Sequence, residues 1–310
     1  MERTKSKMKK ISKVSLIVSL VMCMFLLTAC AKETKTLTVG IMPDLDSIPF
    51  IVAKQQGFLG ENVKLEIYKS PVDRDSAFYS GNLDGSISDV LAACLAQEGE
   101  FPVYITSKTN GRYGIVAGKD TGITSAKMLE GKEIGLSLNT VIEYVTDMMV
   151  KEDGGDITLV SKNSVPKIPS RLELLQNNQI PAVAMPEPFI TAAGNDGNII
   201  VNTSDQLGVN PGVMLFTKDA VEQKSDELKE FYKAYDKAVE YIKTTDPAEF
   251  MPGVIEELGL PETALSVELP AYETTTLPDE AEVEKAMTWL LDKDMLKSEY
   301  SYSDLVKEIK

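Results

Sequence analysis

Acidic and hydroxyl side chains follow the first predicted β-strand, at a place where a protein could bind a small polar molecule. Asp44, Asp46 and Ser47 come after the strand predicted at residues 37–41. Asp44 is nearest the strand end, so we expect it to contact a ligand. Asp46 and Ser47 serve at least as well as helix caps and turn formers. Carboxylates here would accept hydrogen bonds from an amine or a ring N–H.

Similar candidates follow the next two predicted strands. Arg74 could bind an anion, or it could pair with Asp73 or Asp75 in a weak surface ion pair. Ser88 and Asp89 close the third strand and are candidate ligand contacts.

Arg112 and Tyr113 lie where the chain is predicted to cross from one α/β unit to another. Tyr113 offers a flat face for stacking and a hydroxyl group for hydrogen bonding. A crossing segment is also a hinge, so a hinge role competes with a ligand role for both residues.

Ser137, Asn139 and Thr140 lie between a strand and the amino end of a helix. Free backbone N–H groups and the helix dipole make such an end suitable for an anionic or carbonyl oxygen. A role limited to capping the helix is nearly as well supported for Asn139 and Thr140.

The segment 185–188 reads Met-Pro-Glu-Pro, with Glu187 between two prolines. The prolines stiffen the loop, and Pro188 can occupy the first turn of a helix. Glu187 would then accept hydrogen bonds from an amine or amidine-like ligand. The alternative is a first-turn acid that serves only the helix dipole.

These candidates need a scaffold of alternating strands and helices, and the pattern of apolar residues predicts one. The predicted strands are 37–41, 63–68, 85–89, 101–106, 113–117, 132–137, 157–160, 182–185, 199–201 and 212–216. The predicted helices are 48–56, 74–80, 90–96, 124–129, 140–152, 168–176, 225–244, 247–258 and 280–296. Such alternation indicates an α/β fold with mainly parallel sheets covered on both faces.

Crossings near residues 110 and 210 predict two lobes. One lobe takes 37–112 and 210–310, and the other takes 113–209. Ligands of such sheets bind outside the carboxyl ends of the strands, so we expect the ligand between the lobes.

The first 29 residues are typical of an export signal, with a basic leader and an apolar core too short for a comfortable membrane span. Leu27-Thr28-Ala29-Cys30 ends the apolar core and resembles the lipobox of bacterial lipoproteins. The resemblance implies cleavage before Cys30 and lipid on that residue, with 30–36 as a tether on the extracytoplasmic face of the membrane.

The composition excludes several classes of function. The chain of 310 residues has a formal charge of −15 and contains no histidine. The charge argues against nucleic acid as a partner, and the missing histidine excludes Ser-His-Asp and Cys-His catalysis and His-based zinc sites. Cys94 is the only cysteine after Cys30, so we expect a buried thiol and no internal disulfide.

Four further segments carry a family resemblance. They are 48–59 (IPFIVAKQQGFL), 83–89 (LDGSISD), 133–137 with Glu143-Tyr144, and 184–189 (AMPEPF). In this order the chain resembles solute-binding proteins of ABC importers, within the NMT1-like group of thiamine-precursor pyrimidine, nitrate, sulfonate and taurine binders. The resemblance implies a two-lobed, two-crossover periplasmic-binding-protein fold, and a permease and an ATPase as partners. It favours Glu187 as a ligand contact.

We therefore expect a monomeric receptor that is not an enzyme and needs no cofactor or metal. Glu187 and nearby aromatic residues slightly favour a nitrogen-containing ring such as a pyrimidine. The alternative ligand is nitrate, a sulfonate or a taurine-like anion, bound by Arg74, Arg112 and a helix amino end. A surface sensor without a transport role is a more remote possibility.

Overall fold

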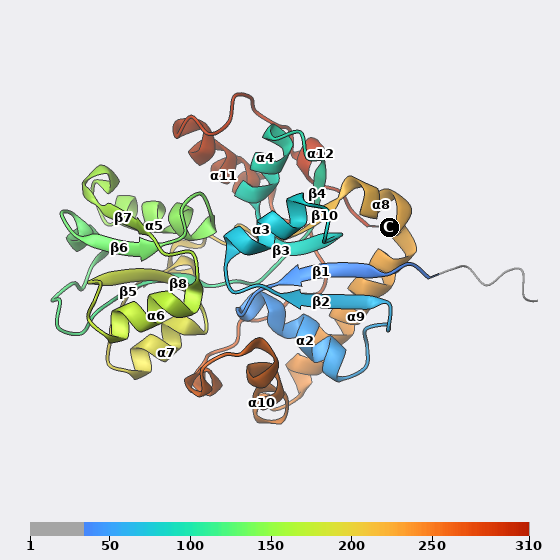
Figure 1. Cartoon of the computed structure of the whole chain (residues 1–310), viewed down its shortest axis with the longest axis horizontal. Helices are drawn as coiled ribbons and strands as arrows, with labels where there is room; N and C mark the ends of the chain where they lie inside the picture. The colour runs from blue at the N-terminus through green and yellow to red at the C-terminus, as the bar shows by residue number, and fades with distance from the viewer. Residues whose placement is uncertain (1–33, 310) are drawn as a thin grey trace, which may run out of the picture. The chain divides into compact units, whose positions relative to one another are not determined.

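The computed structural model describes residues 34–309, and the predicted signal, Cys30 and most of the tether lie outside them. Residues 36–309 belong to one compact unit built on two five-stranded sheets (Figure 1). We call the parts built on these sheets the first and second lobes. No helix within 34–309 has the length and apolar character needed to cross a membrane.

The first sheet has the strand order β2–β1–β3–β10–β4 and the second β7–β6–β8–β5–β9. The first contains β1 (Leu37–Ile41), β2 (Val63–Ile67), β3 (Gly85–Asp89), β4 (Val103–Lys108) and β10 (Gly212–Thr217). The second contains β5 (Tyr113–Ala117), β6 (Glu133–Leu136), β7 (Ser161–Ser164), β8 (Ala182–Pro186) and β9 (Ile199–Thr203). The predicted return of the chain to the first sheet at 212–216 is confirmed.

Each sheet has one strand reversed against the others, β10 in the first and β5 in the second. The sheets are thus mixed, where the pattern of elements predicted mainly parallel pairing. The reason is the path of the chain. Strands β5 and β10 are the two that the chain enters directly after crossing between lobes, so each starts at the edge where the other strands end.

Helices cover both faces of each sheet (Figure 1). The first lobe has α2 (Ile48–Gln55), α3 (Pro71–Tyr79), α4 (Val90–Glu98), α8 (Lys218–Gln223), α9 (Ser225–Thr244), α10 (Pro247–Leu258), α11 (Glu280–Asp292) and α12 (Tyr302–Leu305). The second has α5 (Val141–Glu152), α6 (Ile168–Gln176) and α7 (Phe189–Asn195). Short 3₁₀ turns are η1 (Leu45–Ser47), η2 (Ala126–Leu129), η3 (Ile157–Leu159), η4 (Ser204–Leu207) and η5 (Glu262–Ser266).

Local capping explains where elements differ from the predicted ones. Helix α3 begins at Pro71, earlier than predicted, because Ser70 accepts a hydrogen bond from the backbone of Asp73 and proline suits the first turn. The strand predicted at 157–160 is wrong. Asp156 caps a 3₁₀ turn there, and the polar segment Ser161–Ser164 forms the edge strand instead.

The two crossings between lobes lie side by side. The Thr109 N–H donates to the Gly212 carbonyl at 2.9 Å, and the Tyr113 N–H donates to Ser204 Oγ at 3.1 Å. The lobes are therefore joined by a paired hinge, whereas the exact domain boundaries stay a prediction. Cys94 is fully buried in α4, as expected, and burial raises the pKa of its thiol to about 12.

Candidate functional site

A small cavity lies between the lobes, at the carboxyl ends of strands from both sheets. Its free volume is about 30 Å³, enough for only a few water-sized groups. The first lobe contributes Met42, Asp44, Asp46, Pro71, Arg74, Ile87, Ser88 and Asp89, and the second contributes Tyr113, Ser137, Thr140, Val141, Ile142, Ile168, Arg171 and Pro186. In this conformation the cavity is too small for an organic ligand.

Asp44 and Asp46 follow β1 and line the cavity from below the hinge. Asp44 Oδ1 accepts hydrogen bonds from the backbone N–H and the hydroxyl of Ser47, at 3.2 and 3.1 Å, so it also caps η1. Burial raises the pKa of Asp44 well above its usual value, and the nearby charge of Asp46 raises it further. Burial raises the pKa of Asp46 to about 6, partly opposed by hydrogen bonds to its carboxylate.

Tyr113 joins these acids to the hinge. Its hydroxyl donates to Asp46 Oδ2 at 3.2 Å, from the opposite lobe. Gly111 makes room for this contact, since a Cβ there would lie 2.4 Å from Asp46 Oδ2 and 2.5 Å from the Tyr113 hydroxyl. The segment that joins the lobes therefore also borders the cavity.

Arg74 lies buried on α3 and carries one of the two positive charges in the lining. Its Nε donates to Asp75 Oδ1 at 2.8 Å. Burial by itself would lower the pKa of Arg74, but the charges of Asp75 and Asp89 outweigh burial and raise it. Part of its charge is therefore already balanced within the first lobe.

Asp89 connects the lobes at the opposite wall. Its Oδ1 accepts from the Ala92 N–H at 2.8 Å and so caps α4, while its Oδ2 accepts from the Val141 N–H at 3.4 Å. Val141 is the first residue of α5 in the second lobe. Burial raises the pKa of Asp89, opposed mainly by Arg74.

Arg171 is the second positive group of the lining and is fully buried on α6. It donates to the carbonyls of Val165, Pro166 and Ala184 and to Ser137 Oγ. Burial lowers the pKa of Arg171 to about 9. It therefore ties strand β8 to the segments that follow β6 and β7 in the second lobe. Within residues 34–309, no three acidic, histidine or cysteine side chains are grouped as metal ligands.

The family model for NMT1/THI5-like proteins matches residues 44–249, which are about two thirds of the chain and include both crossings. The chain belongs to this family. The resemblance drawn from the four sequence segments is thereby confirmed. The matched range includes every residue that lines the cavity except Met42.

This NMT1/THI5-like protein is similar to known binding proteins. A Bacillus subtilis (strain 168) protein assigned to the binding of aliphatic sulfonates is 24% identical over 250 residues, covering 73% of this chain and 74% of its own. Among solved structures, the alkanesulfonate-binding protein SsuA from Xanthomonas axonopodis, bound to MOPS, has a TM-score of 0.76 at 16% identity, with coverage of 90% and 100%.

Two further solved structures share the fold. The periplasmic nitrate-binding protein NrtA from Synechocystis gives a TM-score of 0.73 at 16% identity, covering 88% of this chain and 84% of its own. The desulfurization enzyme DSZB gives 0.67 at 14% identity, covering 88% and 96%. The predicted two-lobed periplasmic-binding-protein fold is confirmed. The fold itself serves both binding proteins and an enzyme.

Seven of the ten residues predicted to contact ligand line the cavity of this NMT1/THI5-like protein. They are Asp44, Arg74, Ser88, Asp89, Tyr113, Ser137 and Thr140. Their contact with a ligand stays a prediction. Ser88 Oγ is buried there with no hydrogen-bond partner among the described residues, which leaves it free for a ligand.

Three predicted residues lie outside the lining. Glu187 accepts hydrogen bonds from the Thr191 N–H at 3.0 Å and from the Thr191 hydroxyl at 2.9 Å, so it stabilises the start of α7. Its neighbour Pro186 lines the cavity instead. Arg112 pairs with Asp205 at 3.4 Å beside the hinge. Asn139 has a φ of 59° and presents its N–H to Glu143.

Two charged residues of the lining, Asp46 and Arg171, are not among the predicted contacts. Asp46 was interpreted as a cap, whereas Asp44 caps η1 and both line the cavity. Arg171 lies on a predicted helix with an apolar face. Its place on that face, beside Leu172 and Leu175, was the available signal of a buried arginine.

Proposed function

We propose that this chain is the solute-binding component of an ABC importer, acting as a monomer. It closes its two lobes on a small polar solute and delivers the solute to a permease and its ATPase. The observation that supports this most is the buried cavity at the carboxyl ends of strands from both lobes, with charged groups from each lobe in its lining. Closure about a hinge is what couples such binding to a transporter.

The relatives favour a small anion over the nitrogen-containing ring that Glu187 suggested. Sulfonate and nitrate are the ligands in the relatives' descriptions. The start of α5 offers a suitable contact, because its first N–H already binds a carboxylate oxygen of Asp89. A sulfonate or nitrate oxygen would take the same place, with Arg74 and Arg171 supplying positive charge.

The charge of the lining supports a second candidate, an amine or a nitrogen-containing ring such as a pyrimidine. Three carboxyl groups, Asp44, Asp46 and Asp89, face two guanidinium groups. Burial raises the pKa of all three carboxyls, so a cationic or N–H-rich ligand would relieve the cost of their charge. An anionic ligand would instead favour their protonation.

Anchoring by lipid on Cys30 would hold this receptor on the extracytoplasmic face of the membrane, near the permease. Tethering raises the effective concentration of a receptor at its partner. Radiolabelled palmitate incorporated by wild type and not by Cys30→Ala tests the anchor. A surface sensor would share the anchor, but it would bind no permease in a crosslinking experiment in membranes.

A thermal-shift screen decides between the ligand classes. Ethanesulfonate, taurine, nitrate and a 4-aminopyrimidine are each added to the purified chain. A ligand at about 100 times its dissociation constant adds about 2.7 kcal/mol to the free energy of unfolding. A shift with ethanesulfonate or nitrate alone supports the anion, and a shift with the aminopyrimidine alone supports the ring. Conversion of a ligand to product would overturn the receptor assignment.

A further inference from the structure

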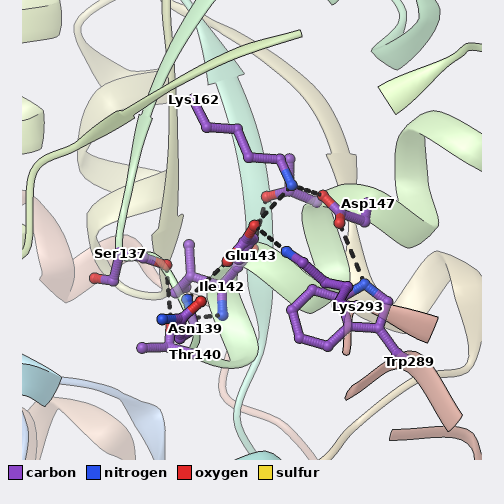
Figure 2. A network of polar contacts seen from close by, with 10 residues as sticks. Ser137, Asn139, Thr140, Ile142, Glu143, Asp147, Lys162, Trp289 and Lys293 are labelled. Carbon is purple, nitrogen blue, oxygen red and sulfur yellow. Dashed lines mark hydrogen bonds and ion pairs between the residues drawn. The ribbon is translucent and has the colours of Figure 1, made fainter. Parts of the chain in front are cut away.

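A second set of contacts joins the lobes outside the ligand cavity, on the far side of α5 (Figure 2). Glu143 and Asp147 stand one turn apart on α5 of the second lobe. Trp289 and Lys293 come from α11 and its carboxyl end in the first lobe, where α11 packs on α4. Lys162 reaches the same place from the edge strand β7.

The side chains make a connected network. Glu143 Oε1 accepts from Lys162 Nζ at 2.8 Å and from Lys293 Nζ, and Asp147 Oδ1 lies 2.6 Å from Lys162 Nζ. Trp289 Nε1 donates to Asp147 Oδ2 at 3.2 Å, and Lys293 Nζ lies 4.3 Å from the centre of the Trp289 ring. Three residues of the second lobe and two of the first thus hold one another.

The charges balance only when the lobes are closed. Glu143 and Asp147 carry two negative charges. Of the two lysines in the network, only Lys162 belongs to the second lobe, and it pairs with both carboxylates. Lys293 supplies the second positive charge from the first lobe. The Glu143 side chain is only 3% exposed, so its charge is little screened by water. Opening the lobes would leave two carboxylates with one lysine.

A groove of about 750 Å³ lies between α5 and α11, and its lining includes Asp147, Trp289 and Lys293 of the network. Besides the polar network, Tyr144 of α5 contacts Trp289 of α11, with ring centres 5.6 Å apart.

The network also reaches the ligand cavity. Glu143 Oε2 accepts from the Asn139 N–H at 2.7 Å, which holds the left-handed turn before α5. Ser137, Thr140 and Val141, on either side of that turn, line the cavity. Figure 2 shows Glu143 lying between this turn and the two lysines.

We propose that Glu143, Asp147, Trp289 and Lys293 form an inter-lobe clasp. Glu143 and Lys293 act in it as positioning residues that fix the cavity end of α5 and favour the closed state. The clasp slows solute release without touching the solute. This extends the proposed function, but its first test needs no ligand.

Trp289 is the only tryptophan of the chain, so intrinsic fluorescence reports on the clasp directly. Emission maximum and acrylamide quenching are measured on the free chain for wild type, Lys293→Met and Lys293→Arg. The matched control is Lys233→Met, an exposed lysine of α9 that pairs only with Glu230 on its own helix. We expect the Lys293→Met emission to shift to the red with stronger quenching, and Lys293→Arg and the control to resemble wild type.

Because Lys293 lies over the Trp289 ring, emission alone would also respond to a local change. Small-angle scattering of the same variants measures lobe separation instead. We expect a larger radius of gyration for Lys293→Met and for Glu143→Gln. Both variants folded, with the radius of gyration of wild type, would overturn the proposal. Thermal unfolding curves identify a variant that fails to fold, in which case Lys293→Gln takes its place.

Release kinetics with ethanesulfonate form the second test. We expect Lys293→Met to raise the dissociation rate roughly ten-fold with little change in association, and the effects of Glu143→Gln and Lys293→Met to be non-additive. Additive effects, or a change confined to association, would contradict a clasp. If ethanesulfonate does not bind wild type, the anion assignment fails while the scattering result still decides the clasp.

Discussion

Asp89 of the first lobe accepts a hydrogen bond from the backbone N–H of Val141 in the second lobe, at 3.4 Å. A carboxylate thus occupies the amino end of α5, which is the part of the second lobe best suited to an anion. An anionic solute must share or replace that charge, and the first prediction follows from this competition.

Replacing Asp89 by Asn should raise the affinity for ethanesulfonate roughly ten-fold, because one negative charge leaves the buried lining. The Asn side-chain oxygen can still cap α4 through the Ala92 N–H. Isothermal titration calorimetry measures the change, with exposed Asp120→Asn as the control. Weaker binding by Asp89→Asn would favour the amine or pyrimidine ligand instead.

Anion binding should tighten as the pH falls from 8 to 5. Burial raises the pKa of Asp46 to about 6, and an anion nearby raises it further, so binding is coupled to proton uptake. One proton taken up corresponds to at most about ten-fold in affinity per pH unit. Titrations at pH 5, 6, 7 and 8 test this, and Asp46→Asn should flatten the dependence. A cationic ligand would show the opposite slope.

Asp46→Asn should also stabilise the free protein at pH 8, by about 2 kcal/mol. The pKa of Asp46 is higher in the folded than in the unfolded chain, so wild type gains stability as the pH falls through 6. The advantage of the variant should therefore vanish near pH 4. Urea unfolding at both pH values measures it, and Asp120→Asn should change neither. Equal stability of Asp46→Asn and wild type at pH 8 would contradict the burial cost.

Gly111→Ala should destabilise the closed protein by about 1 to 3 kcal/mol, because the added methyl group overpacks the hinge. Its Cβ would lie 2.4 Å from Asp46 Oδ2 and 2.5 Å from the Tyr113 hydroxyl. Urea unfolding gives the change in free energy. Gly99→Ala is the control, since its nearest neighbour would be 3.3 Å away, and similar losses in the two variants would contradict the steric account.

The sequence predicted the alternation of elements and most of the polar residues of the cavity lining because both depend on local patterns. Residues at strand ends, such as Asp44 and Asp89, can be recognised in the sequence because they are polar and follow apolar runs. The reversed direction of β5 and β10 could not be predicted from local patterns, since it follows from the crossings between lobes.

Contacts between distant segments explain the remaining differences. Glu187 was expected in the site, but its carboxylate is taken by Thr191 one turn later. Arg171 belongs to the lining because loops of the second lobe fold around it, bringing the Val165 and Ala184 carbonyls to one guanidinium. The clasp between Glu143 and Lys293 joins residues 150 positions apart, and no local pattern predicts such a pair.

Because the two crossings lie side by side, the second lobe is inserted into the first as one unit. The chain enters it at Tyr113 and leaves near Ser204, and these two residues are hydrogen-bonded at 3.1 Å. The positions where the chain enters and leaves the second lobe are therefore adjacent in space. Two splices at this point would exchange the whole lobe, with Ser137, Thr140 and Arg171, for that of a relative. The half of the site contributed by α5 and α6 could thus be exchanged while the first lobe keeps its own contacts.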